Sequence, residues 1–442
     1  MLNVTIPGPL TYEQTCRFTT IALLTLSLAS VAKVSRADDQ DVFKLEAGVV
    51  RTEDNNLFRL PDAVDPFLLG AGGHQRSETI TASHLGLTMD QSIGLQQFHL
   101  EGFETYYDYK NYSFLSGTTT NFLASWQLAI TRALTGKLST QRQSSPANFS
   151  YYQIYNKRDI VTLDSTDLNL DWSPTSTLHL TTDLAERKYI DSADNKQISS
   201  YDSKFMEFGL LYAFTSGGSI GVVNDRTLGT IPDQVLSPIY QLDTGFQQNE
   251  DKLTLNWPFT TRAQLNAQAG YLKRDYDHFS TRNYSGGTGT LSLNYGLLDT
   301  VYVVGPLASG YTELPLDFGI LASVNRSYNP FVNDDESYFI DDKKTVQILY
   351  TPTPKINLKL RFDDNKDNYL GAITGNILTP RRSDIYKVYT LELDWNPAKS
   401  LALAAVLARE QRDSTAAVNT NGCLYGCSYK DNNVSFSLIY KY

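Results

Sequence analysis

From about residue 40 to the end of the chain, apolar and polar side chains alternate at every second position. Clear examples are 167–172, 252–257, 356–362 and 391–395, in which Leu, Ile, Phe and Trp alternate with Asp, Asn, Lys, Thr, Glu and Arg. Helical spacing fits none of these stretches, whereas a period of two places the apolar residues on one face of a β-strand. The sequence therefore predicts strands that have one apolar and one polar face.

The connections between these strands fall into two classes. Short turns marked by Pro or Gly are predicted near Asp90-Gln91, Leu134-Thr135-Gly136, Ser173-Pro174, Ser216-Gly217-Gly218, Pro258-Phe259, Asp299, Thr353-Pro354 and Asn396-Pro397. Longer linkers rich in Asn, Asp, Ser and Gly are predicted at 52–76, 191–197, 231–244, 363–383 and 414–428. Short turns on the periplasmic rim and long loops on the outer rim are typical of an outer-membrane barrel.

The last segment of the chain, 434–442, has apolar residues at alternate positions and ends on an aromatic residue. An apolar edge strand of this kind promotes aggregation in a soluble protein, so we expect it to pair with the first strand, near 42–50, and leave no edge. The predicted fold is an all-β, antiparallel, up-and-down transmembrane barrel of about 18 strands, with 16 to 20 possible because 300–336 is ambiguous. The candidate C-terminal signal for the assembly machinery consists of Phe436, Leu438, Tyr440 and Tyr442.

Three predicted short turns carry a Trp followed by Pro, at Trp172, Trp257 and Trp395. Trp prefers the headgroup level of a membrane, where its ring is half apolar and half hydrated. We interpret these three residues as an interfacial belt, after which Pro ends the hydrogen-bond ladder. A soluble β-sandwich with buried Trp residues is the alternative, but it does not explain why they gather on one rim.

The N-terminal part of the chain resembles a secretory leader. Arg17 precedes the apolar run 21–29, and Ser35-Arg36-Ala37 offers small residues before a cleavage site at Asp38, with Ala32 as a second possible site. We therefore expect residues 1–37 to be an N-terminal extension with a signal peptide and 38–442 to form the barrel. The run is too short to span a membrane as a helix.

Cysteine use agrees with export to an oxidising compartment. Cys16 would leave with the signal peptide, so Cys423 and Cys427 remain in the mature chain. Their spacing predicts a small-loop disulfide, and a metal pair is the alternative. No other His or Cys stands near them in the sequence to complete a metal site.

Composition excludes some functions and leaves others open. Charged residues make up 19% of the chain and aromatics 12%, and the net charge of −10 disfavours nucleic acid as a partner. The five His residues form no metal motif, and there is no nucleophile elbow or phosphate-binding glycine loop, so we expect neither an enzyme nor a cofactor. The acidic stretch 363–367 has oxygen ligands for calcium but lacks the later Gly and Glu of a calcium loop, which favours a solvated acidic outer loop.

Alternation assigns the polar face of the strands to the lumen. The predicted lumen-lining residues are Asp167, Asn169, Asp171, His179, Asp183, Arg187, Lys252, Asn256, Gln264, Asn266, Gln268, Lys359, Arg361, Glu392 and Asp394. Charges of both signs and amides can exchange hydrogen bonds with sugar hydroxyls, but the same lining would hydrate any porin.

The first part of the mature chain resembles the EpsL family, outer-membrane proteins of exopolysaccharide biosynthesis operons. The similarity is carried by 43–49, by Asp54-Asn55-Asn56-Leu57-Phe58-Arg59-Leu60-Pro61-Asp62, and by shorter matches up to the Trp-Pro turns. The resemblance implies a barrel that carries a polysaccharide across the outer membrane. The motif Asp54, Asn55, Asn56, Leu57, Phe58, Arg59 is predicted either to lie in the first outer loop or to fold inward as a constriction.

These observations lead to three hypotheses about function. The first is a porin for export of an exopolysaccharide, with outer-membrane lipid, the assembly machinery and a periplasmic polysaccharide-export protein as partners. The second is a plugged structural or adhesin-like barrel that acts through its outer loops, and the third is a general small-solute porin. Conductance with and without polymer separates the first two hypotheses.

Overall fold

The computed structural model describes residues 42–150, 155–192, 200–215, 217–238, 241–296, 318–330, 338–370, 382–415 and 428–442. Eighteen strands lie within these ranges: β1 Phe43–Asp54, β2 Glu78–Ile93, β3 Gln96–Tyr109, β4 Gly117–Ala129, β5 Leu134–Pro146, β6 Ile160–Trp172, β7 Leu178–Asp191, β8 Tyr201–Ala213, β9 Ser219–Thr230, β10 Gly245–Thr260, β11 Ala263–Tyr276, β12 Tyr284–Gly296, β13 Phe318–Pro330, β14 Tyr338–Thr353, β15 Ile356–Leu370, β16 Ser383–Ala398, β17 Leu401–Ser414 and β18 Tyr429–Lys441. Three short 3₁₀ helices lie between strands: η1 Pro66–Leu69, η2 Ser113–Leu115 and η3 Ser280–Arg282.

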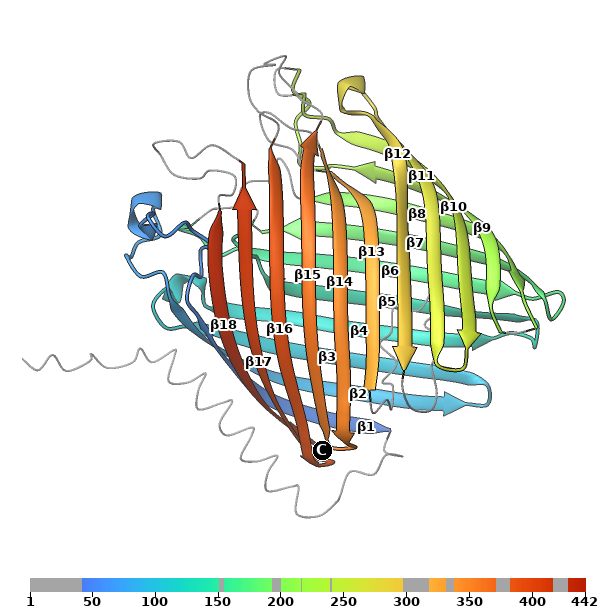
Figure 1. Cartoon of the computed structure of the whole chain (residues 1–442), viewed down its shortest axis with the longest axis horizontal. Coiled ribbons are helices and arrows are strands. Elements are labelled where there is room, and N and C mark those ends of the chain that lie inside the picture. The colour runs from blue at the N-terminus through green and yellow to red at the C-terminus, as the bar shows by residue number, and fades with distance from the viewer. Residues whose placement is uncertain are drawn as a thin grey trace, which may run out of the picture.

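Each strand pairs with its neighbours in the chain, and the sheet closes on itself. β1 pairs antiparallel with β2 and also with β18, through a register that joins Glu46 to Lys441 and Asp54 to Asn433. Figure 1 shows the result, with β13–β18 nearly upright and crossing the strands β3–β8 of the opposite wall. This crossing reflects the strong strand tilt that closure of a sheet requires. The predicted closed barrel and its predicted strand number are confirmed.

The exterior of the barrel is apolar and the interior is polar. Leu138, Leu168 and Leu184 lie side by side on β5, β6 and β7, and Leu138 and Leu184 are 39% and 38% exposed. The neighbouring row, Ser139, Asp167 and Ala185, points to the opposite face. A closed antiparallel sheet with an apolar outer surface is the architecture of a bacterial outer-membrane barrel. The protein is therefore an outer-membrane β-barrel.

The two rims differ as the sequence indicated. Only two residues connect β2 to β3, β10 to β11, β14 to β15 and β16 to β17, and both ends of the barrel sheet, Phe43 and Lys441, lie on this same rim. On the other rim, residues 55–77 connect β1 to β2. In the part of the chain that the structure describes, no helix is long and apolar enough to cross a membrane.

Several predicted turns lie elsewhere. β2 continues through Asp90-Gln91, and the chain turns at Gly94, whose φ of 62° is accessible to glycine at no steric cost. β5 already begins at Leu134, so its turn precedes 134–136. The acidic stretch 363–367, predicted to be an outer loop, belongs to β15, which runs on to Leu370.

The prediction that Pro ends the ladder after each Trp is confirmed at Trp172, where β6 ends before Pro174, but it is wrong at the other two Trp residues. β10 continues through Pro258 to Thr260 and β16 continues through Pro397 to Ala398. The register shifts between Pro258 and Thr260, and between Trp395 and Ala398. On β10 the shift leaves Phe259 outside the ladder while Pro258 stays paired with Gln264. On β16 it leaves out Asn396 and Pro397, and a position outside the ladder suits Pro397 because it has no backbone N–H. The three predicted belt residues Trp172, Trp257 and Trp395 face outward at 49%, 48% and 46% exposure, and Trp126 adds a fourth outward ring that the sequence analysis missed.

Some predictions fall outside the described residues. These are the leader segment 1–37, the short turn near Asp299, the disulfide between Cys423 and Cys427, and the ambiguous part of 300–336 before β13. For the ambiguous segment, the structure shows only that β13 begins at Phe318.

Candidate functional site

The inner face of the barrel carries all fifteen predicted lumen-lining residues. The register pairs Asn169 with Asp183 and Lys359 with Glu392, so these side chains share the face opposite the outward Leu and Trp residues. Near the short-turn rim the face is rich in amides, and Gln264 donates to Asn256 at 2.7 Å and to Asn266 at 3.1 Å. A polar inner face of this kind is compatible with water in the lumen.

Ion pairs link the inward charges both within a strand and between strands. Lys359 Nζ lies 2.6 Å from Glu392 Oε2, and Arg361 lies 2.7 Å from Asp363. Lys252 lies 3.1 Å from Glu207 and also contacts Asp225, both of which the sequence analysis missed. The cross-strand partners were missed because alternation assigns a face to each strand but gives no register between strands.

Carboxylates outnumber cationic groups on this inner face. The predicted residues include five acidic side chains and four Lys or Arg side chains. The register adds Glu207, Asp225 and Asp363 to the acidic side. A lumen with an excess of negative charge attracts cations electrostatically, so we expect a channel formed by this barrel to prefer them.

The predicted constriction motif folds inward against the barrel wall. Arg59, with φ of 54°, lies 3.0 Å from Asp54 on β1, 3.1 Å from Asp431 on β18 and 3.7 Å from Glu410 on β17. Asn56 donates to the backbone carbonyls of Leu60 and Lys430, each at 2.8 Å. The first connection is therefore fixed to the strands on both sides of the closure point.

The apolar residues of the motif form the centre of a small core at this mouth. Phe58 and Leu60 are fully buried. The ring of Phe58 packs edge-on against Tyr112, Phe149 and Tyr155, at centroid distances of 4.8, 4.9 and 5.5 Å. These rings belong to the connections between β3 and β4 and between β5 and β6, so three outer connections meet over one part of the mouth.

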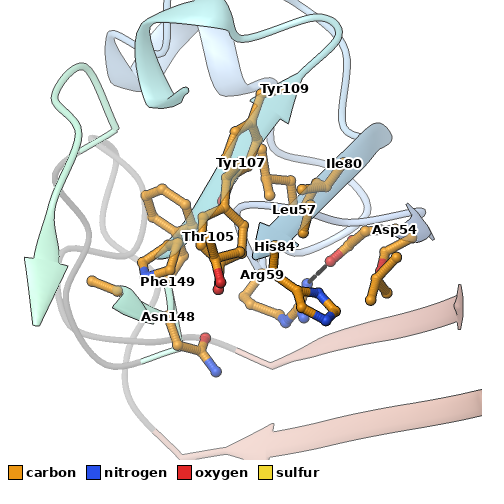
Figure 2. A pocket seen from close by; sticks show the side chains of 15 residues that line it. Asp54, Leu57, Arg59, Ile80, His84, Thr105, Tyr107, Tyr109, Asn148 and Phe149 are labelled. Atoms are coloured by element: carbon orange, nitrogen blue, oxygen red, sulfur yellow. Dashed lines mark hydrogen bonds and ion pairs between the residues drawn. The ribbon is translucent and has the colours of Figure 1, made fainter. Parts of the chain in front are cut away.

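A cavity of about 470 Å³ lies between this core and the barrel wall. Figure 2 shows Thr105 and Tyr107 of β3 on one side and Asn148 and Phe149 on another, with Arg59 nearby. Aromatic rings, a hydroxyl, an amide and a guanidinium thus meet in one hollow. This set offers both flat apolar surfaces and groups that donate or accept hydrogen bonds.

Further aromatic rings gather on the inner wall at the outer ends of the strands. Arg274 lies 3.3 Å from the ring centroid of Phe246, and Arg382 lies 4.1 Å from that of Tyr369. Tyr189 and Tyr201, less buried, stack with centroids 5.5 Å apart. The inner face therefore changes along the barrel, from amides near the short turns to rings and Arg near the outer mouth. In the sequence, this change is marked by aromatic residues at the outer ends of the strands, at the alternate positions that otherwise carry polar side chains.

Two outer connections are joined by the buried carboxylate of Asp243. This residue accepts hydrogen bonds from the backbone N–H groups of His278 at 2.8 Å and Phe279 at 3.0 Å, and His278 Nδ1 lies 2.9 Å away. Burial raises the pKa of the Asp243 carboxyl, but the hydrogen bonds from His278, Phe279 and Thr244 outweigh it, so the net pKa lies below its ordinary value of 3.8. The ionised form is thus the one that joins the β9–β10 connection to η3.

Replacing Asp243 with Asn is expected to loosen this contact. Hydrogen bonds to a charged acceptor contribute about 1.5 to 3 kcal/mol, so amide exchange at His278 and Phe279 should accelerate roughly tenfold or more at pH 7. Because the folded-state pKa is lowered, the contribution is present above pH 3.8 and is lost as the pH falls through the lowered pKa. Hydrogen–deuterium exchange measures the effect, and Asp233→Asn, at an exposed position of the same connection, is the control. Equal protection in both variants would contradict this role of Asp243.

No protein-family model matches the sequence, and no curated protein matches it. Solved structures with a similar fold include a BenF-like porin from Pseudomonas fluorescens Pf-5, with a TM-score of 0.49 and 11% identity over 90% of this chain and 99% of that chain. The outer membrane protein OpdK from Pseudomonas aeruginosa has a TM-score of 0.46 and 10% identity over 90% and 99%. OccK9 (OpdG) from the same organism has a TM-score of 0.46 and 12% identity over 90% and 98%.

Proposed function

We propose that this barrel is an outer-membrane porin through which an exopolysaccharide leaves the cell. The observation that carries the proposal is the cavity at the outer mouth, where Tyr107 and Phe149 lie beside Thr105, Asn148 and Arg59. The resemblance of the first hundred mature residues to the EpsL family supports the same cargo. The protein would act as a passive conduit, without catalysis or a cofactor.

The size of the barrel and its inner face support a channel. Eight strands leave an interior that side chains can fill, whereas barrels of 16 to 18 strands leave an aqueous lumen. This barrel has eighteen strands, and its inward residues include amides and ion-paired charges. Polar side chains of this kind hydrate a pathway along which a polar polymer can move.

The mouth cavity supports a sugar cargo. A sugar ring has an apolar face that packs on an aromatic ring, and hydroxyls at its edge that bond to amides, hydroxyls and guanidinium groups. Tyr107 and Phe149 supply rings, while Asn148, Thr105 and Arg59 supply polar groups. The stacked pair Tyr189 and Tyr201 offers a second aromatic surface farther around the inner wall.

Partners follow from the direction of transport. The short-turn rim would face a periplasmic polysaccharide-export protein, and the last strand would be recognised by the assembly machinery. Within that strand, Phe436, Leu438 and Tyr440 face outward at 59%, 46% and 42% exposure, which leaves their side chains available for recognition. Outer-membrane lipid then covers the exterior.

A general small-solute porin is the second candidate function. The excess of carboxylates on the inner face favours this second candidate. Such a face selects small ions by their charge, and this selection does not require a polymer. Block of the current by purified exopolysaccharide separates the two functions. A polymer porin is blocked by micromolar to millimolar polymer, whereas a small-solute porin conducts equally with or without it.

Replacing Tyr107 with Ala tests the sugar-binding part of the proposal. Loss of one ring contact of about 1 kcal/mol should shorten polymer-induced current blocks about fivefold and reduce secretion of polymer in a complemented deletion strain. Tyr106→Ala is the matched control, because Tyr106 is the adjacent residue of β3 and points to the outer face. Unchanged block times in Tyr107→Ala, with normal amounts of barrel in the membrane, would contradict the assignment.

A further inference from the structure

The outer surface of the barrel has a hollow of about 820 Å³ across strands β10 to β15, which lie next to one another in Figure 1. Two neighbouring cross-strand rows line it. The first row runs through Leu255, Ala267, Leu291, Val324, Lys344 and Asp364, and the second through Leu253, Ala269, Gly289, Arg326, Asp342 and Lys366.

Small residues make this surface concave. Ala267, Ala269 and Gly289 lie on β11 and β12, whereas Leu253 and Val324 on either side stand out at 52% and 48% exposure. The hollow therefore runs across the strands as a groove between larger side chains. Its floor on β10–β12 is apolar.

The other end of the groove is charged. On β13, β14 and β15, three outward cations, Arg326, Lys344 and Lys366, alternate with the carboxylates Asp342 and Asp364. Arg326 lies 3.6 Å from Asp342, and both side chains are exposed. Lys387 on β16 pairs with Asp364 in the register and adds a fourth cation at this level. The end of the groove on β13–β16 therefore has a net positive charge.

The groove rises toward the outer rim as it crosses the tilted strands. Lys366 lies four residues before the end of β15 at Leu370, whereas Leu253 lies eight residues after the start of β10 at Gly245. Both of those strand ends are at the rim of the long connections. The charged end is thus near the headgroup level of the outer leaflet, and the apolar end lies at hydrocarbon depth.

We propose that this groove is a binding site for a phosphorylated glycolipid of the outer leaflet. An acyl chain would lie along Leu253, Ala269 and Leu291, and a phosphate group would lie near Arg326, Lys344 and Lys366. The polarity of the groove, apolar at membrane depth and cationic at the headgroup level, is complementary to a lipid that has an anionic head. A second copy of the chain is the less suitable occupant, because it would have to place acidic side chains opposite these cations.

The test compares Lys344→Gln/Lys366→Gln with the unmodified full-length barrel in detergent, using native mass spectrometry with added bis-phosphorylated lipid A. Affinity for lipid A should fall about fivefold or more in the double variant, and dephosphorylated lipid A should bind the unmodified barrel as weakly as the variant does. Lys188→Gln/Lys204→Gln is the matched control, because these outward residues lie near the outer ends of β7 and β8 and away from the groove. This control should retain full affinity.

Three outcomes would overturn the proposal. One is an equal loss of affinity in the control pair, which would indicate general electrostatic attraction. Another is phosphatidylglycerol binding as tightly as lipid A, which would remove the specificity for an outer-leaflet glycolipid. The third is a dimer in which cross-links at Val324→Cys join two copies, because a partner barrel would then occupy the groove. Since both substitutions in the double variant are at exposed positions, we expect it to fold as the unmodified barrel does.

Discussion

Replacing Arg59 with Ala is expected to release the first outer connection from the barrel wall and to raise single-channel conductance. Arg59 is 8% exposed and neutralises carboxylates from three strands, Asp54, Glu410 and Asp431. Removing one partner of a buried ion pair costs roughly 3 to 5 kcal/mol, because the remaining charges stay buried without compensation. The strand ladder is untouched, so this cost acts on the closed position of 55–77 and not on the barrel.

The released connection should be visible in two measurements. Limited proteolysis should cut 55–77 in reconstituted Arg59→Ala at least ten times faster than in the unmodified protein, and the conductance step should increase. Arg51→Ala is the control, because Arg51 pairs with Glu53 at 2.7 Å on the exposed side of β1, where an ion pair contributes about 1 kcal/mol or less. If Arg59→Ala shows the same steps and cleavage rate as Arg51→Ala, the inward position of the motif does not control the pore.

Replacing Leu168 with Arg is expected to destabilise the barrel strongly, whereas Asn169→Arg on the next residue is not. Leu168 faces outward between Leu138 and Leu184, and Asn169 faces inward opposite Asp183. A charged side chain facing lipid near the bilayer midplane costs about 2 to 4 kcal/mol. The Arg at 169 instead gains a carboxylate partner in a hydrated interior.

Unfolding of the two variants by guanidinium chloride in phospholipid vesicles measures this difference directly. The midpoint should fall for Leu168→Arg and should change little for Asn169→Arg. A larger loss for Asn169→Arg than for Leu168→Arg would mean that the two faces have been assigned the wrong way round. Equal losses would mean that neither face contacts hydrocarbon.

The strands and the closure of the sheet could be predicted because both depend on local patterns. Alternation in 167–172 or 391–395 assigns each side chain to a face without knowledge of any partner. The apolar last strand predicted its own pairing with β1, since an open apolar edge is unfavourable. The charge and amide content of the inner face followed from the same alternation.

The turns and the mouth could not be predicted in the same way. Pro258 and Pro397 look like strand ends in sequence, yet each lies inside its strand, beside a register shift at Pro258 and within one at Pro397. The stretch 363–367 belongs to the outer part of β15, and composition alone does not separate such a polar strand end from a loop. The cavity beside Tyr107 joins residues from β3, β1 and the β5–β6 connection, and only the folded barrel brings them together.

Planar-bilayer recording of the purified barrel under a salt gradient tests the central claim that the polar inner face surrounds an open aqueous pathway. Discrete conductance steps are expected, with a reversal potential that indicates a preference for cations over anions, because carboxylates outnumber Lys and Arg on that face. The unmodified protein should also show shorter or partial steps in the presence of polymer. Insertion of folded barrel into the bilayer without any conductance step would contradict the claim.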